Sequence, residues 1–169
     1  QFTDLPVPAL PLQNAATVLA TLEHVPLSVS ESAIRSGLEN AQLAGRFQTL
    51  QNHPTVIIDV AHNPHAARYL AMQLEKQKAD KIIAVVGMLK DKDIAHTLQH
   101  IVPYVSVWHL ADLSGPRAAA AGDLAALLPP ESTFRCHGSV EDAYQAALTQ
   151  ANEHDLIIVF GSFFTVAGV

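Results

Sequence analysis

The first quarter of the chain carries the apolar spacing of two amphipathic helices. Over residues 12–23, apolar side chains recur at intervals of three and four, which places them on one helical face. Ser30 favours the start of a second helix, because its hydroxyl can accept a hydrogen bond from a first-turn N–H group. The expected buried positions are Ala15, Val18, Leu19 and Leu22 in the first helix, and Ile34, Leu38 and Ala41 in the second.

From Arg46 onward, short apolar runs alternate with helical spacing. Residues 56–60 and 156–160 are apolar apart from Asp59, and such runs are typical of parallel strands buried on both faces. Strand–helix alternation with short connections predicts an α/β fold: a Rossmann-like, doubly wound, mostly parallel sheet with helices on both faces. The expected strands are residues 56–60, 81–86, 104–110, 133–136 and 156–160, and the expected helices are residues 64–78, 93–101, 119–128 and 139–152.

The segment Asp59–Pro64 is the richest in chemistry, and it follows a predicted strand. Sheets of this kind bind ligands beyond the carboxyl ends of their strands. Asn63 is a good N-cap for the next helix, and free N–H groups at a helix start attract phosphate. The Asp59 carboxylate could accept a hydrogen bond from a ribose hydroxyl. Alternatively, Asn63 only caps the helix and His62 is a solvated loop residue; the position of Asp59 and His62 favours a functional role.

Three further segments could meet an anion. Lys92 and Asp93 follow the second predicted strand, where Lys92 could contact an anionic group or belong to a solvated loop. Ser162 follows the last strand and could present its hydroxyl to a carboxylate, or simply cap a helix. Arg46 could bind a phosphate through two N–H groups, or form a surface ion pair.

Several phosphate and metal motifs are absent from the sequence. It contains neither the G-x-x-x-x-G-K-[ST] loop nor the G-x-G-x-x-G fingerprint, so most of any grip on ATP must come from elsewhere. His96 and His100 have metal-ligand spacing, but Thr97 stands where the zincin motif has its Glu. We therefore expect no metal ligands in this chain.

Composition narrows the function classes. The 169 residues are 49% hydrophobic and 15% charged, which is typical of a globular domain. The net charge of -6 argues against nucleic acid as a partner. No apolar run approaches the roughly 20 residues that span a bilayer, and Cys136 is the single cysteine, so we expect a soluble, cytoplasmic protein without a membrane partner. The missing initiator Met and a last helix that stops early indicate a fragment of a longer protein.

The candidate segments together resemble the C-terminal domain of the folylpolyglutamate synthase branch of the Mur ligase superfamily. The resemblance covers about the last three quarters of the chain and looks most like the bacterial bifunctional type, which also makes dihydrofolate. Residues 10–16 look like the last helical stretch of the central ATPase domain of that family. The segments that carry the match are Gly45–Gln48, Asp59–Pro64, Gly87–Asp93 and Phe160–Val166.

This resemblance implies a domain organisation and a reaction. Residues 1–44 would be the end of the central ATPase domain with linker helices, and residues 45–169 the glutamate ligase domain, truncated at its C-terminus. The implied enzyme is a monomer that uses ATP and Mg²⁺ to add L-glutamate to dihydropteroate or folates through an acyl phosphate. Because the phosphate loop and the Mg²⁺ ligands of the family lie in its N-terminal part, the fragment would need that partner domain for activity.

The resemblance also assigns roles to individual residues. Asn14 would read the adenine, Arg46 would contact the phosphates and Asp59 the ribose. His62 would lie by the phosphates or the incoming glutamate, and Ser162 near the glutamate carboxylate. The implied catalytic residues are His62, Lys92 and Ser162, and the implied nucleotide-binding residues are Asn14, Arg46, Asp59, His62 and Asn63.

Two other functions stay open at this point. The chain could come from a cell-wall Mur ligase, although Gly87–Leu89 and Phe160–Phe163 resemble the folate branch more closely. It could also be a non-catalytic nucleotide-binding module, in which Asp59 and His62 would serve binding alone.

Overall fold

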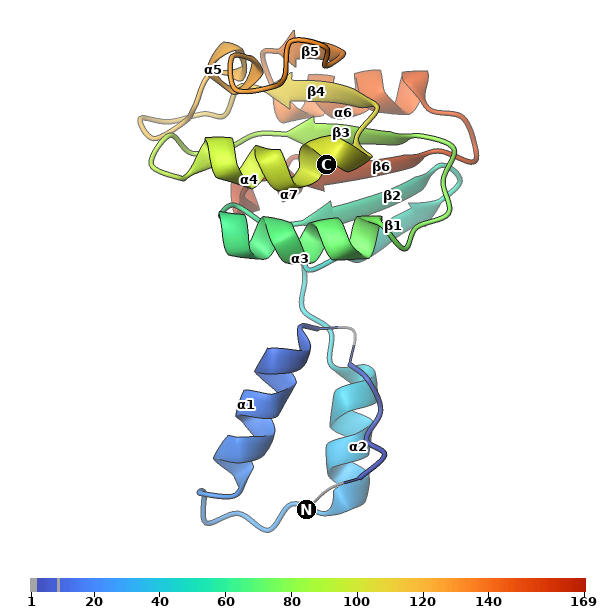
Figure 1. Cartoon of the computed structure of the whole chain (residues 1–169), viewed down its shortest axis with the longest axis vertical. Helices are drawn as coiled ribbons and strands as arrows, with labels where there is room; N and C mark the ends of the chain where they lie inside the picture. The colour runs from blue at the N-terminus through green and yellow to red at the C-terminus, as the bar shows by residue number, and fades with distance from the viewer. Residues whose placement is uncertain (1–2, 9) are drawn as a thin grey trace. The chain divides into compact units, whose positions relative to one another are not determined.

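The computed structural model describes residues 3–8 and 10–169. The chain divides into two compact units, Gln1–Ala44 and Gly45–Val169 (Figure 1). The division falls where the sequence changes from helical spacing to strand–helix alternation. Within the described residues, no helix is both long and apolar enough to cross a membrane.

The N-terminal unit contains the two helices that the apolar spacing predicts. They are α1 (Leu12–Leu22) and α2 (Glu31–Asn40), and the Ser30 hydroxyl accepts a hydrogen bond from the Ala33 N–H group at 3.2 Å. The burial expected for α1 is wrong, since Val18 is 56% exposed and the other expected positions are only half-buried; in α2 only Ile34 is buried.

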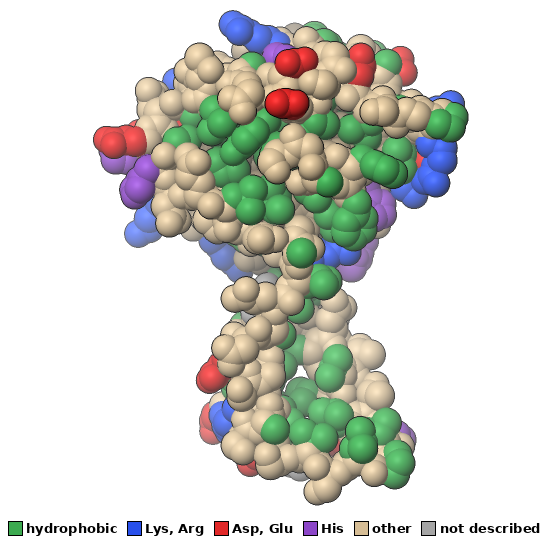
Figure 2. All heavy atoms as spheres, turned by 180° about the vertical axis from the view of Figure 1, so that it is seen from behind, with side chains coloured by type: hydrophobic (Ala, Val, Ile, Leu, Met, Phe, Trp, Pro, Cys, Tyr) green, Lys and Arg blue, Asp and Glu red, His purple; other side chains and the backbone are tan. Residues whose placement is uncertain are grey.

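An apolar groove of about 290 Å³ runs between these two helices, and we call it the α1–α2 groove. Figure 2 shows hydrophobic side chains gathered on this unit. The groove is lined by Pro8, Leu10, Asn14, Ala15, Val18, Leu19, Leu22, Val29, Ala33, Ile34, Gly37, Leu38 and Ala41. Two short helices cannot cover their own apolar faces, so much of this surface is left to solvent within the unit.

The second unit is the predicted α/β fold. Its six-stranded sheet has the order β1-β2-β6-β3-β4-β5, with every pairing parallel except β1 with β2. The strands are β1 (Gln48–Asn52), β2 (Thr55–Asp59), β3 (Ile82–Val86), β4 (Val107–Ala111), β5 (Phe134–His137) and β6 (Leu156–Phe160). The helices are α3 (Pro64–Leu74), α4 (Ile94–Ile101), α5 (Ala121–Ala125), α6 (Val140–Gln150) and α7 (Phe163–Val166), with a 3-10 turn at Val102–Tyr104.

Helices cover both faces of the sheet, as the sequence predicts. Helices α3 and α4 pack on one face through Leu70, Leu74 and Leu98, and α6 packs on the other through Val140, Ala143 and Ala147 (Figure 1). Successive side chains of β2 point to opposite faces of the sheet. Ile57 packs in the core on the α3 and α4 face, and Ile58 packs in the core on the α6 face.

Several elements differ from the prediction, and α5 is shorter than expected, covering Ala121–Ala125 rather than residues 119–128. Strand β1 is absent from the prediction because all five of its residues are exposed, so its sequence carries no apolar signal. Helix α3 ends at Leu74, its last buried residue, rather than at residue 78. Strand β4 begins only at Val107 because Pro103 starts a 3-10 turn.

A buried histidine lies between β4 and α6. His109 is fully buried, and its Nε2 and Nδ1 atoms lie 2.9 Å from Gln150 Oε1 and 2.9 Å from His137 Nε2. The amide oxygen can only accept, so His109 Nε2 donates to it and Nδ1 accepts from His137. Two protonated rings could not keep this arrangement, because two N–H groups would then face each other.

We expect this pair to make the fold weaken in mild acid. Burial lowers the pKa of both His109 and His137, since desolvation disfavours the charged imidazole. The unfolded chain takes up these protons near its ordinary histidine pKa of about 6.5, so stability is lost as the pH falls below that value. The loss is bounded by ~1.4 kcal/mol per pH unit for each histidine.

Urea unfolding of the chain between pH 7.5 and 5 measures this slope. His109→Leu should flatten it, whereas His65→Gln, at an exposed site on α3, should leave it unchanged. A slope that His109→Leu does not alter would assign the acid sensitivity to other groups.

Candidate functional site

Three of the predicted segments begin at the same edge of the sheet. Asp59 at the end of β2 and Val86 at the end of β3 are both register partners of Phe160 at the end of β6. The segments Asp59–Pro64, Gly87–Asp93 and Gly161–Ser162 therefore leave the sheet beside one another. This is the carboxyl edge, where ligands of doubly wound sheets bind.

Asp59 holds two backbone segments together. Its Oδ2 accepts a hydrogen bond from the Phe47 N–H group at 2.9 Å, and its Oδ1 accepts from the Ala61 N–H group at 2.7 Å. Phe47 has a φ of +43°, which is unusual for a residue with a side chain. The carboxylate thus stabilises a strained turn at residues 45–47 and ties it to the loop after β2.

The charge state of Asp59 reflects opposing effects. Burial raises the pKa of this carboxyl above its ordinary value, while the N–H groups of Phe47 and Ala61 and the positive charge of Arg46 act to lower it. Arg46 is half-buried in the 45–47 turn. Asp59 therefore also holds Phe47, the residue next to Arg46, in place. The sequence pattern could not show this structural role.

Asp59→Asn should destabilise the fold although it is nearly isosteric. The amide has one acceptor oxygen, so an NH₂ group would face either the Phe47 or the Ala61 N–H group. We expect the free energy of unfolding to fall by about 1–3 kcal/mol, the cost of an unsatisfied buried donor.

Asp112→Asn is the matched control for this measurement. One oxygen of Asp112 accepts from the Ala121 N–H group at 2.7 Å, and an amide can keep that single bond. The control should change stability by at most about 0.5 kcal/mol. Equal effects of the two substitutions in chemical denaturation would contradict the two-oxygen role of Asp59.

His62 has a defined tautomer. Its Nδ1 lies 2.8 Å from the carbonyl oxygen of Val60, which can only accept, so Nδ1 donates. This leaves Nε2 available for a ligand, either as an acceptor or, when protonated, as a donor. The side chain is half-buried, so it is held in place while one edge remains accessible.

Asn63 caps α3 as the sequence predicts. Its side-chain oxygen accepts from the Ala66 N–H group at 2.9 Å, and Pro64 occupies the first turn. The start of an eleven-residue helix therefore lies next to His62, and its partial positive charge favours anions there.

Lys92 and Asp93 both have protein partners. Lys92 Nζ lies 3.1 Å from Asp91 Oδ2, and Arg117 Nε lies 3.2 Å from Asp91 Oδ1. Asp93 caps α4 and contacts the ring of His96. The hydrogen bond from Lys92 lowers the pKa of Asp91, and the one from His96 lowers the pKa of Asp93. The Asp91 carboxylate thus holds Lys92 at the carboxyl edge, and a ligand there would share the Lys92 ammonium group with Asp91.

Ser162 is a buried helix cap, and Asn14 belongs to the other unit of the chain. Ser162 is buried, and its hydroxyl caps α7 by accepting from the Thr165 N–H group at 3.0 Å. Asn14 lies exposed on α1 of the N-terminal unit, which the structure describes separately from the sheet.

The arrangement suits anion binding better than metal binding. Arg46, His62 and the start of α3 offer positive charge and donors around the end of β2. Among the described residues, no group of three His, Cys, Asp or Glu side chains could hold a metal ion. Each oxygen of Asp59 accepts one backbone hydrogen bond and keeps a lone pair for a hydroxyl donor, but without two further possible ligands beside it Asp59 does not form a Mg²⁺ site within the described residues.

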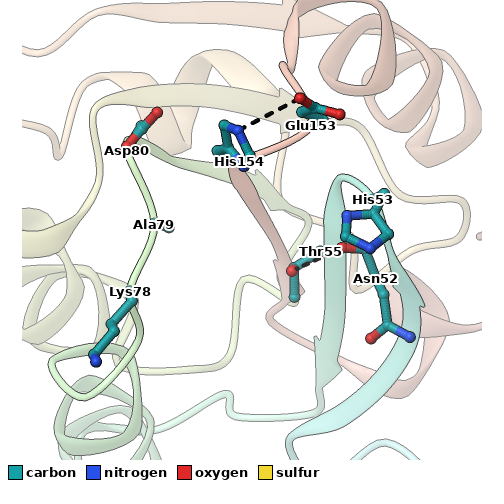
Figure 3. A pocket seen from close by; sticks show the side chains of 8 residues that line it. All are labelled: Asn52, His53, Thr55, Lys78, Ala79, Asp80, Glu153 and His154. Carbon is teal, nitrogen blue, oxygen red and sulfur yellow. Dashed lines mark hydrogen bonds and ion pairs between the residues drawn. The ribbon is translucent and has the colours of Figure 1, made fainter.

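A second hollow lies at the opposite, amino edge of the sheet. Its volume is about 430 Å³, and Figure 3 shows its lining residues, which come from the β1–β2 hairpin and the loops before β3 and β6. Its one ion pair joins His154 Nε2 to Glu153 Oε1 at 3.4 Å, between exposed side chains. Ligands of doubly wound sheets bind at the other edge, so this hollow is not the candidate site.

Comparison with known proteins supports the resemblance found in the sequence. Residues 45–163 match the family described as Mur ligase, glutamate ligase domain. Dihydrofolate synthase/folylpolyglutamate synthase of Escherichia coli (strain K12) is 47% identical over 98% of this chain and 39% of its own length.

Two solved structures extend this comparison. A bifunctional folylpolyglutamate synthase/dihydrofolate synthase from Yersinia pestis c092, complexed with AMPPNP and Mn ion, is 51% identical, with a TM-score of 0.91 over 99% of this chain and 40% of its own. A bifunctional enzyme of the same name, with Mn, AMPPNP and L-glutamate bound, is 50% identical, with a TM-score of 0.92 over 99% of this chain and 40% of its own.

The chain spans about two fifths of the length of these relatives. The family match nevertheless covers most of it and takes in all six strands of the sheet together with the candidate segments after β2, β3 and β6. The predicted resemblance is confirmed, and the chain belongs to the Mur ligase family through its glutamate ligase domain.

Proposed function

We propose that this chain is the C-terminal part of a bifunctional folylpolyglutamate synthase/dihydrofolate synthase. The complete enzyme would use ATP to phosphorylate a carboxylate of dihydropteroate or a folate, and the amine of L-glutamate would displace that phosphate to form an amide. The observation that carries the proposal is the set of anion-binding groups at the carboxyl edge, in a chain about half identical to enzymes solved with a nucleotide and L-glutamate.

The residues of this chain would act by positioning and by charge. Arg46 and the Nε2 edge of His62 would lie by the phosphates, and both would stabilise the negative charge that develops there. Asp59 would accept from the ribose through its remaining lone pairs, and Asn63 would hold the start of α3 toward the phosphates. Asn14 would read the adenine, while Lys92 and Ser162 would belong to the glutamate side.

The rest of the active site would come from the remaining three fifths of the protein. The sequence contains no phosphate loop, and the described residues hold no group of three side chains that could bind a metal ion, so the N-terminal ATPase domain would supply both. The α1–α2 groove supports this division, because its apolar lining needs a covering that the described residues 3–8 and 10–44 do not provide. We propose that the complete enzyme is a cytoplasmic monomer and that the isolated chain is inactive.

ADP release by the full-length protein tests this proposal. We expect release that requires Mg²⁺, L-glutamate and either dihydropteroate or tetrahydrofolate, and none from residues 1–169 alone. Release with a muramyl-nucleotide acceptor in place of the pterin would assign the chain to a cell-wall ligase. Nucleotide binding without release under any condition would identify a binding module.

A further inference from the structure

A chain of buried hydroxyl groups connects the segments that follow β6 and β3. Thr165 Oγ1 lies 2.5 Å from the carbonyl oxygen of Gly87 and 2.7 Å from Ser162 Oγ. Thr165 is fully buried and Ser162 is 5% exposed. We call these three groups the hydroxyl chain.

The direction of each hydrogen bond follows from the chemistry of the groups. The Gly87 carbonyl can only accept, so the single hydroxyl proton of Thr165 points to it. Ser162 must then donate to Thr165 Oγ1, while Ser162 Oγ accepts from the Thr165 N–H group at 3.0 Å. The hydroxyl proton of Ser162 is therefore already used inside the protein and is not available to a ligand.

The backbone around the hydroxyl chain is closely packed. A side-chain carbon at Gly161 would overlap the Gly87 carbonyl oxygen, and one at Gly87 would lie 2.7 Å from Leu113. The loops after β3, β4 and β6 thus converge on Gly87. Thr165 lies in α7, directly after β6. Its hydroxyl donates to the carbonyl of Gly87, the first residue after the β3 ladder.

We infer that Thr165 is a positioning residue for the glutamate side of the site, where it fixes the path of the Gly87–Asp93 loop and of Lys92 within it. This inference rests on the proposed function. The nucleotide side is held by different bonds, those of Asp59 with Phe47 and Ala61 and that of the Val60 N–H group with the Gly45 carbonyl. The hydrogen bonds that hold the two halves share no residue, so loss of the hydroxyl chain should affect the substrates unequally.

Steady-state kinetics of the full-length ligase tests this separation. Thr165→Val keeps the shape of the side chain and removes its hydroxyl, and we expect kcat/KM for L-glutamate to fall about tenfold through misplacement of the loop. KM for ATP should change less than about twofold, and Thr165→Ser, which restores the hydroxyl, should recover most of the loss. Equal losses for both substrates, or no loss, would overturn the inference.

Two further variants separate positioning from other causes. Leu74 is the last residue of α3 and lies at the amino edge of the sheet. Leu74→Val should lower stability without making the effect on kcat/KM for L-glutamate larger than the effect on KM for ATP. Ser162→Ala removes the donor to Thr165 but keeps the Thr165–Gly87 bond, so its loss for glutamate should be no larger than that of Thr165→Val. A larger loss would mean that Ser162 contacts glutamate directly. A wild-type protein without ligase activity would instead overturn the proposed function.

Discussion

Gly161→Ala is expected to destabilise the chain by at least about 3 kcal/mol, because strain and overlap occur at one residue. Gly161 has a φ of +122°, a backbone conformation that side chains disfavour. The added methyl group would also overlap the Gly87 carbonyl oxygen and lie 2.8 Å from Met88 Cγ. The carbonyl belongs to the backbone at the end of β3, so it cannot move without disturbing the central strands.

Urea titration gives the free energy of unfolding of the Gly161→Ala variant, which is compared with that of the Gly122→Ala variant. Gly122 lies in α5, and a methyl group there would meet nothing within 4 Å. We therefore expect the control to leave stability unchanged or to raise it by up to ~1 kcal/mol through helix propensity. If Gly161→Ala were tolerated as well as the control, the close approach of the β3 and β6 loops would be wrong.

His62→Ala should lower the turnover of the full-length ligase about a hundredfold, the usual effect of removing one group that stabilises developing charge. The Nδ1 hydrogen bond to Val60 holds the ring, and Nε2 is left toward the proposed phosphate side. This bond is local, so the free energy of unfolding should change by less than about 1 kcal/mol.

His100→Ala is the control for turnover. His100 is also half-buried, but it lies in the last turn of α4, toward the amino edge of the sheet. Turnover close to that of the unmodified enzyme is expected for this control. Wild-type turnover in His62→Ala as well would remove His62 from the site.

Much of the fold could be predicted because its signals are local. The runs that form β2 and β6 are apolar for their whole length, and the capping residues Asn63 and Ser139 mark where helices begin. Parallel strands with short connections then place the carboxyl edge, and with it Asp59 and His62, without knowledge of the strand order.

The features that the sequence did not predict depend on contacts between residues that are distant along the chain. Asp59 and Phe47 are twelve residues apart, and nothing in either segment indicates their hydrogen bond. Thr165 and Gly87 are separated by 78 residues, so the burial of the Ser162 hydroxyl could not be foreseen. Strand β1 is held by pairing with β2 alone, and its exposed polar residues carry no periodic signal.

The position of β6 has a consequence for biosynthesis. Of the strands described here, β6 comes last in the sequence, yet it lies between β2 and β3 and pairs with both. Until residue 160 has emerged, the nascent chain holds two incomplete sheets, β1–β2 and β3–β4–β5, each with an open edge that can pair with another chain. The sheet therefore closes only once β6 has emerged, and we expect a premature stop before residue 156 to yield an aggregation-prone product rather than a smaller folded one.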